Sequence, residues 1–148
     1  YCCAHCNSTK LAIEKFDNIL NCTIESHDVD RKISYRIEAF PISRPIFKAN
    51  EATETVQNTI DLLNDVFSGR TELKEIESSN LRENLIQEIY NFNLLIIDYL
   101  NSNRDVDDKI ETRKLILKEL ESDSAFTAFK IWIIRDNQRL REEFPDFF

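Results

Sequence analysis

Four cysteines are the residues of this sequence with the clearest capacity for covalent or metal chemistry. All of them lie within the first 22 residues: Cys2, Cys3, Cys6 and Cys22. An even number of cysteines in a secreted chain predicts disulfides, and four cysteines allow three pairings. The alternative is a zinc site at Cys3, His5 and Cys6, because the Cys-x-x-Cys spacing suits zinc. A second ligand pair is missing, since the only other histidine is His27. We therefore expect disulfides, with no metal and no cofactor.

The pairing of these cysteines depends on the segment that separates them. Residues 7–27 have the apolar spacing of a helix, which would place Cys6 and Cys22 about 24 Å apart at 1.5 Å per residue. A disulfide requires Cα atoms within roughly 7 Å of each other. A direct bond between Cys6 and Cys22 therefore conflicts with the helix unless the N-terminal arm, residues 1–6, folds back. Cys2 or Cys3 could reach Cys22 more easily, and the pairing stays open.

Two sequons for N-linked glycosylation stand beside the cysteines. They are Asn7-Ser8-Thr9 and Asn21-Cys22-Thr23. Such sequons mark surface positions in secreted proteins. Methionine and an apolar leader are both missing from the sequence, which is typical of a chain whose signal peptide has been removed. We expect a secreted, extracellular glycoprotein.

The composition favours one helical domain. The 148 residues include 42% apolar and 31% charged side chains, which suits a single globular domain over residues 1–148. One glycine and three prolines are too few for the many tight turns of an all-β fold or for a glycine-rich phosphate loop. Few turns and long segments between them indicate helices.

Charge and histidine content exclude several classes of function. The net charge of −8 argues against a nucleic-acid partner. The sequence has no run of about 18 apolar residues, so we expect no insertion into a membrane. Nucleophilic and acid–base catalysis usually need a histidine or another base beside the reacting group. The two histidines, and carboxylates scattered over polar helix faces, form no such constellation. We expect a binding protein and no enzyme.

Apolar residues recur at helical spacing in five segments. These are residues 7–27, 50–68, 80–101, 105–121 and 123–144. Asn50 and Asn80 are the expected caps of the second and third helices, and Gly69 is the expected stop of the second. The third helix has the longest stripe, Leu81, Leu85, Ile89, Phe92, Ile96 and Tyr99. Its run from Leu94 to Ile97 is apolar on every side, which predicts a central helix.

The connection over residues 27–49 is unusually long. It holds two X-Pro pairs, at Pro41 and Pro45, that disfavour helix. Its apolar side chains predict an ordered crossover loop packed on the body. The fold expected is all-α, a bundle of five helices with a long first crossover and a loose tail at residues 145–148.

Several of these segments resemble type I interferons. The motifs are Phe40-Pro41, the run Phe47 to Ala52, Val56 to Ile60 with Asp65 to Ser68, Ser79 to Leu85 with Tyr90 to Phe92, and Ser124 to Arg135. The resemblance implies an up-up-down-down five-helix cytokine bundle that bridges the two chains of a cell-surface receptor, as a monomer, to trigger antiviral or immune signalling. It places receptor contacts on the first helix, the long loop and the last helix, and a second face on the second to fourth helices. The implied receptor-binding residues are Arg31, Arg36, Lys130, Arg135 and Arg139.

The chain departs from that family in its cysteines. The family ties its first loop to its last helix by a disulfide, whereas Thr127 stands where the last-helix cysteine is expected and no cysteine follows Cys22. The body of the bundle would then be held by packing alone, as in a distant, non-mammalian branch. The alternatives are an interferon-γ-like or interleukin-10-like interlocked dimer, and a secreted structural or inhibitory module tethered through its cysteines.

Overall fold

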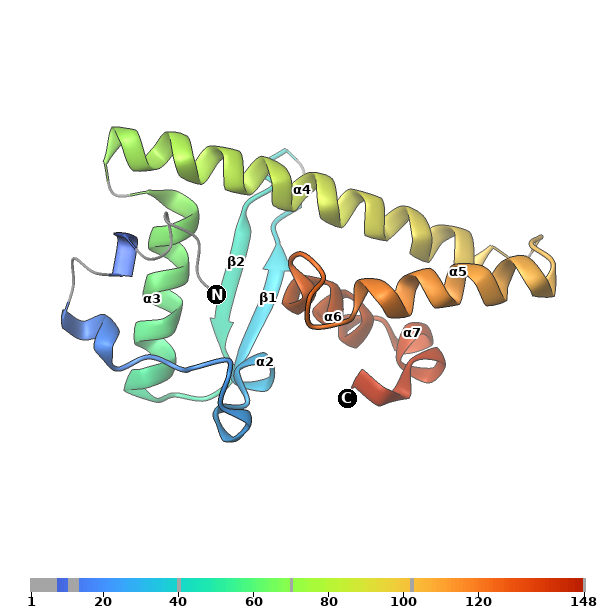
Figure 1. Cartoon of the computed structure of the whole chain (residues 1–148), viewed down its shortest axis with the longest axis horizontal. Coiled ribbons are helices and arrows are strands. Elements are labelled where there is room, and N and C mark those ends of the chain that lie inside the picture. Colours follow the sequence, from blue (N-terminus) through green and yellow to red (C-terminus); the bar gives the residue numbers. More distant parts are fainter. Residues whose placement is uncertain (1–7, 11–13, 40, 70, 102, 148) are drawn as a thin grey trace. The chain divides into compact units, whose positions relative to one another are not determined.

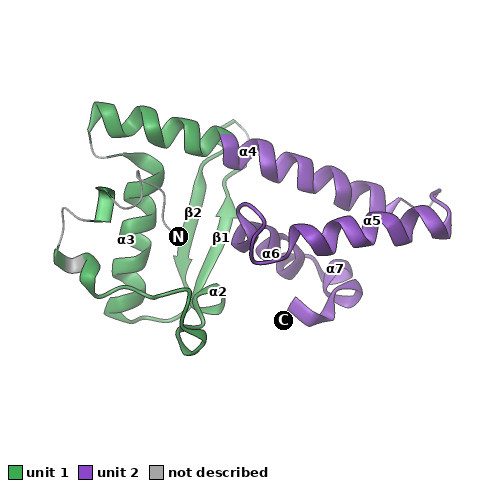
Figure 2. Cartoon of the chain, viewed as in Figure 1, with its two compact units in different colours: residues 1–83 green, residues 84–148 purple. Residues whose placement is uncertain are grey.

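The computed structural model describes residues 8–10, 14–39, 41–69, 71–101 and 103–147, and these are mostly helical (Figure 1). The chain divides into two compact units, residues 1–83 and residues 84–148, coloured separately in Figure 2. The elements, in order, are the 3-10 helices η1 (Glu14–Asp17) and η2 (Glu25–His27), α2 (Val29–Lys32), the strands β1 (Ile33–Ile37) and β2 (Pro45–Ala49), α3 (Glu54–Ser68), α4 (Glu72–Leu100), α5 (Val106–Glu119), α6 (Thr127–Asp136), α7 (Gln138–Glu143) and η3 (Pro145–Phe147).

A β-hairpin in unit 1 replaces the crossover loop predicted over residues 27–49. β1 and β2 pair antiparallel, with Tyr35 opposite Phe47 and their rings edge to face at 5.6 Å. The scarcity of glycine argued against tight turns, yet the hairpin loop has Ser43 at φ 47° in the left-handed region. The paired strands mean that the fold is not purely helical, and the hairpin loop is made without glycine because a serine takes a conformation that usually selects it.

The first predicted helix, residues 7–27, is confirmed only at residues 8–10 and is wrong over residues 18–24. η1 and η2 are short, and residues 18–24 between them are not helical. Their backbone bonds to α3 instead: the Leu20 N–H donates to Thr59 Oγ1 at 2.8 Å, and Asn58 Nδ2 donates to the Asn18 carbonyl at 3.2 Å. Phe16 in η1 is fully buried. Tertiary hydrogen bonds thus replace the helix that the apolar spacing predicted for residues 18–24. The objection that a straight helix separates Cys6 from Cys22 therefore no longer applies.

Helix α3 confirms the second predicted helix, residues 50–68, from Glu54 onward, but the predicted cap at Asn50 is wrong. Val56, Ile60 and Phe67 are buried. Thr53 caps the helix, since its Oγ1 accepts from the Val56 N–H at 3.3 Å. Asn50 lies outside the helix and donates to the Arg31 carbonyl at 2.7 Å.

Helix α4 begins at Glu72 and continues through Asn80, so the predicted cap at Asn80 is wrong. Ser78 is fully buried there, and its Oγ donates to the Val66 carbonyl at 2.8 Å. This bond joins α4 to α3 within unit 1. A residue that can cap a helix therefore lies inside one here, where the nearby Ser78 binds the preceding helix, α3.

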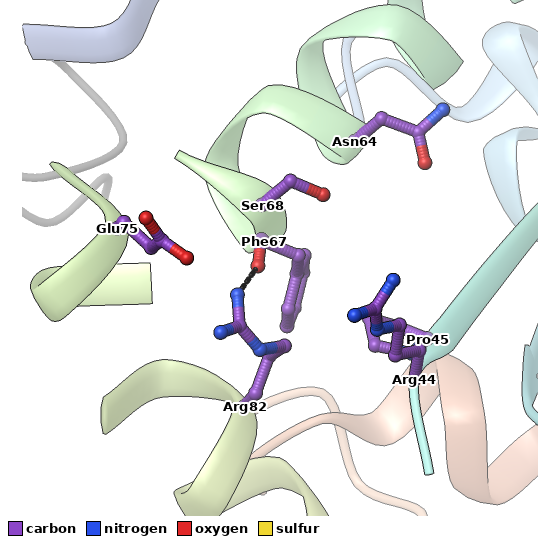
Figure 3. Close-up of a pocket in the computed structure, with 7 residues that line it drawn as sticks. All are labelled: Arg44, Pro45, Asn64, Phe67, Ser68, Glu75 and Arg82. Carbon is purple, nitrogen blue, oxygen red and sulfur yellow. Dashed lines mark hydrogen bonds between the residues drawn. The ribbon is translucent and has the colours of Figure 1, made fainter. Parts of the chain in front are cut away.

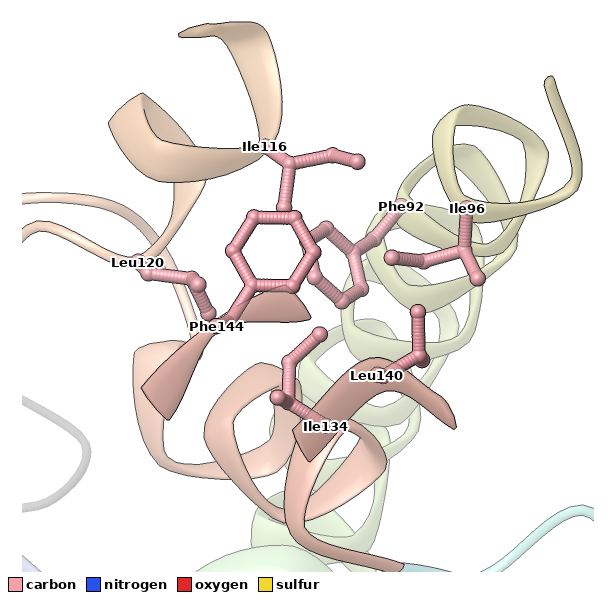
Figure 4. Close-up of a cluster of buried hydrophobic side chains, with 7 residues drawn as sticks. All are labelled: Phe92, Ile96, Ile116, Leu120, Ile134, Leu140 and Phe144. Carbon is pink, nitrogen blue, oxygen red and sulfur yellow. The ribbon is translucent and has the colours of Figure 1, made fainter. Parts of the chain in front are cut away.

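Unit 2 encloses a core built by α4, α5, α6 and α7 (Figure 4). The buried side chains are Phe92, Ile96, Ile116, Leu120, Ile134, Leu140 and Phe144. The predicted core stripe of the third helix is confirmed at Leu85, Ile89, Phe92 and Ile96. Asp105 caps α5, as its carboxylate accepts from the Asp108 N–H at 2.8 Å, so the predicted start of this helix is confirmed within one residue.

The last predicted helix, residues 123–144, begins four residues later than predicted and is interrupted once. Residues 123–126 form turns, with Phe126 at φ 54°, and Asn137 separates α6 from α7. Asn137 is extended, and its Oδ1 accepts from the Leu140 N–H at 3.2 Å, which starts α7 anew. The tail predicted to be loose forms η3, and Phe147 packs against the core of unit 2, whereas Phe148 lies outside the described residues.

Candidate functional site

The two arginines expected from the long loop both lie at the surface of unit 1. Arg31 in α2 has a side chain 62% exposed, with Asp28 Oδ1 at 3.8 Å. Arg36 is exposed on β1, opposite Ile46 of β2. Ion pairs between exposed groups contribute little stability, so the Arg31 guanidinium can exchange Asp28 for another carboxylate at small cost. Both side chains are accessible to a partner.

The two arginines expected from the last helix differ in their surroundings. Arg135 in α6 is half-buried: its Nε donates to the Phe147 carbonyl at 3.0 Å, and its guanidinium lies 5.4 Å from the centre of the Trp132 ring. Arg139 in α7 is exposed. Arg135 therefore holds η3 against α6, and Arg139 is the more accessible of the two.

Lys130, the fifth expected contact residue, is fully buried. Its ammonium donates to Glu88 Oε1 at 2.7 Å, to Glu119 Oε2, and to Ser124 Oγ at 3.0 Å. The ring of Phe92 lies 5.9 Å away. An ammonium with these partners and no exposed surface cannot reach a receptor, so the expected role of Lys130 is corrected: it joins α4, α5 and α6 inside unit 2.

The lysine changes the acidity of one of its carboxylates. The hydrogen bond from Lys130 is the main reason why the pKa of Glu119 lies below the ordinary value of 4.5. Partial burial acts in the opposite direction, and the hydrogen bond from Ser124 lowers the pKa further. The ionised form of Glu119 is therefore favoured in the folded chain.

We expect the free energy of unfolding to decrease at acid pH because Glu119 becomes protonated. Because the pKa of Glu119 is lower in the folded chain than in the unfolded chain, its contribution is complete above about pH 4.5 and is lost as pH falls through the lowered value. Urea midpoints measured on both sides of pH 4.5 should show a smaller acid-induced fall in Glu119→Gln than in the native chain. Identical pH profiles in the two proteins would contradict this assignment.

An exposed apolar row on α4 was missed by sequence reasoning. Tyr90, Leu94 and Ile97 are 58%, 47% and 65% exposed, and their spacing of four and three residues places them on one helix face. That face lies about 130° round the helix from Ile89, Phe92 and Ile96, which are buried. The apolar run from Leu94 to Ile97 predicted a central helix that is buried on all sides, whereas two of these four residues, Leu94 and Ile97, are exposed.

The predicted glycosylation site at Asn21 is exposed, as is Cys22, which carries a free thiol. The Asn21 side-chain oxygen accepts from the Thr23 N–H at 3.0 Å and from the Thr23 hydroxyl at 2.8 Å. Asn7, Cys2, Cys3 and Cys6 lie outside the described residues, and so do the ligands of the alternative zinc site.

The described ranges hold no group of three or more His, Cys, Asp or Glu side chains placed to bind a metal ion. In the same part of the chain, none of the helices combines the length and the hydropathy that a membrane span requires. Comparisons with protein-family models, with curated proteins and with solved structures found no match to this chain.

Proposed function

We propose that this chain is a secreted, type I interferon-like cytokine that acts as a monomer and brings two receptor chains together at a cell surface. The proposal rests on the sequence motifs of α3, α4 and α6 and, above all, on the apolar row of Tyr90, Leu94 and Ile97. As part of this proposal, the cytokine bundle consists of α3, α4, α5 and the segment that α6 and α7 form. Residues 18–24 do not supply its first helix.

The apolar row carries the proposal because its exposure needs an explanation. Three large apolar side chains on one helix face, each about half exposed or more, form the kind of patch that marks a protein-binding surface. Their solvent-facing neighbours on α4, Gln87, Asn91 and Asn93, carry no charge. In the bundle that the motifs imply, this face belongs to the second to fourth helices, which contact one of the two receptor chains.

The other receptor chain would contact the exposed arginines. Within unit 1 the candidates are Arg31 and Arg36, and within unit 2 they are Arg139 and the exposed part of Arg135, while Lys130 is withdrawn because it is buried. Arginine is enriched among the residues that dominate binding energy at protein interfaces. Once one receptor chain is bound at the membrane, the second meets the ligand at a high effective concentration. No covalent chemistry is required.

Binding of the chain to the ectodomains of the two type I interferon receptor chains tests the function. We expect replacement of Leu94 and Ile97 by asparagine to weaken binding to one ectodomain about tenfold or more and to leave binding to the other unchanged, because interface hot spots are local. Leu115→Asn on α5 is the matched control, since Leu115 is an apolar residue 51% exposed outside the row. Surface plasmon resonance gives each dissociation constant separately.

The outcomes separate the function from the site. If the native chain binds neither ectodomain, the proposed function is wrong. If it binds and the double variant binds as tightly, the row is not the contact surface. A mass of two chains in solution would favour the interlocked dimer over a bridging monomer.

A further inference from the structure

A pocket of about 230 Å³ lies within unit 1 and belongs to none of the surfaces described above (Figure 3). It is formed where the start of β2 meets the end of α3 and the first half of α4. Its lining is Arg44, Pro45, Asn64, Phe67, Ser68, Glu75 and Arg82. Two arginine side chains, an amide and a hydroxyl group thus line one small space, and in Figure 3 the Phe67 ring lies between the two guanidinium groups.

Arg82 is held in place by the backbone. Its Nη1 donates to the carbonyl of Phe67 near the end of α3, and the side chain is half-buried (Figure 3). A guanidinium has five N–H donors in a rigid planar fork, so this bond leaves donors for a further acceptor. The position of the group is thereby fixed before any ligand binds.

Arg44 faces the same pocket without a competing carboxylate. Its side chain is exposed, and within the described residues its guanidinium has no hydrogen-bond or ion-pair partner. Glu75 is the one acidic side chain of the lining, and in Figure 3 it lies on the same side of Phe67 as the Arg82 guanidinium and on the opposite side from Arg44. Two arginines and one glutamate give the lining a net charge of +1, in a chain whose total charge is −8.

We propose that this pocket binds one carboxylate group, that of an aspartate or glutamate side chain on a protein partner. The planar fork of arginine matches a carboxylate through two parallel hydrogen bonds. The Asn64 amide and the Ser68 hydroxyl add neutral donors. The proposal deepens the receptor-binding function and rests on it for the identity of the partner, but the pocket itself can be tested without a receptor.

The local charge favours a singly charged carboxylate over a phosphate group. A charge of +1 is matched by one negative charge, whereas a phosphate dianion would leave an excess. The pocket also adjoins the C-terminal end of α3, where the helix dipole is negative and opposes a doubly charged anion more strongly than a singly charged one. The net charge of −8 repels polyanions from the molecule as a whole.

Titration of the full chain with acetyl-glutamate amide, which carries one carboxylate, tests the proposal. We expect saturable changes in the NMR signals of the Arg44 and Arg82 Nε–H groups and of the Ser68 N–H, with a dissociation constant on the order of 1 mM. Acetyl-glutamine amide, which has the same size and no charge, should cause none of them. Arg44→Gln should weaken binding about tenfold, and Arg31→Gln, at another exposed arginine of unit 1, should not change it.

Four results would overturn the proposal: no saturable change in the native chain, equal binding of the glutamine probe, unchanged binding in Arg44→Gln, or tighter binding of inorganic phosphate than of the glutamate probe. The variant of Leu94 and Ile97 should bind acetyl-glutamate amide as the native chain does. Loss of receptor binding with an intact pocket, or the reverse, therefore shows which of the two proposals has failed.

Discussion

Replacement of Lys130 by methionine is expected to lower the free energy of unfolding by about 3 kcal/mol. Methionine retains most of the length of lysine but removes the ammonium that neutralises Glu88 and Glu119. The two carboxylates are then left close together without their shared cation, and the Ser124 hydroxyl loses a donor. Each glutamate side chain is about one-third exposed, at 32% and 34%, so water recovers part of this loss. Urea unfolding followed by circular dichroism measures the change.

Two controls separate the buried network from a general effect of charge removal. Lys114→Met removes an exposed lysine paired with Glu111 at 2.7 Å on α5, and should cost no more than about 0.5 kcal/mol. Adding Glu88→Gln and Glu119→Gln to Lys130→Met should restore part of the lost stability, because no unpaired carboxylate remains. If Lys130→Met costs no more than Lys114→Met, the network does not stabilise unit 2.

Replacement of Gly69 by alanine is expected to cost about 3 kcal/mol or more. Gly69 ends α3 at φ 74° and ψ 146°, a region that side chains rarely adopt. A Cβ at this position would also lie 2.5 Å from the Glu75 backbone nitrogen and 2.7 Å from its Cα. Because these atoms belong to the first turns of α4, the clash can be relieved only by moving backbone. Thermal unfolding should show a large fall in the midpoint.

Ser68→Ala is the matched control for Gly69→Ala. Ser68 is the last residue of α3 and is exposed, so the same final side chain is introduced one position earlier without a positive φ. Its effect should lie within about 0.5 kcal/mol of zero. Similar midpoints for the two variants would mean that the turn at Gly69 tolerates a side chain and that the close approach of α4 is not maintained in solution.

Helices that bury one clear stripe were predictable from the sequence. The stripes of α3 and α4, the capped start of α5 and the positive φ at Gly69 all follow from spacing and local capping chemistry. Asn80 and Asn50 show the limit of that chemistry: both residues can cap a helix, but neither does. Ser78 binds α3 from inside α4, and Asn50 bonds to the Arg31 carbonyl, so contacts distant in sequence decided both boundaries.

The hairpin and the first segment could not be predicted from local patterns. Residues 18–24 have a helical period but satisfy their backbone on Thr59 and Asn58 of α3, and this choice depends on tertiary packing. The hairpin turn lacks glycine and places Ser43 at positive φ, so the usual signal was missing.

The candidate site shows the same limit. Lys130 lies within an apolar segment, Phe129 to Ile134, and this position indicates burial. The resemblance to type I interferons nevertheless led to its assignment as a receptor contact. The arginines were placed at the surface by residue type, and four of the five expected contact residues are at least partly accessible. The exposure of Leu94 and Ile97 depends on which neighbours cover α4, and periodicity alone does not give this information.

The interruption at Asn137 has a consequence for biosynthesis. Helix α7 has six residues, too few to be stable as an isolated helix, so it depends on Leu140 and Phe144 entering the core of unit 2. During translation, Phe92 and Ile116 leave the ribosome well before these two partners are made. The apolar core residues of unit 2 must therefore stay exposed in the nascent chain until Phe144 has emerged, and chaperones can bind them during this interval.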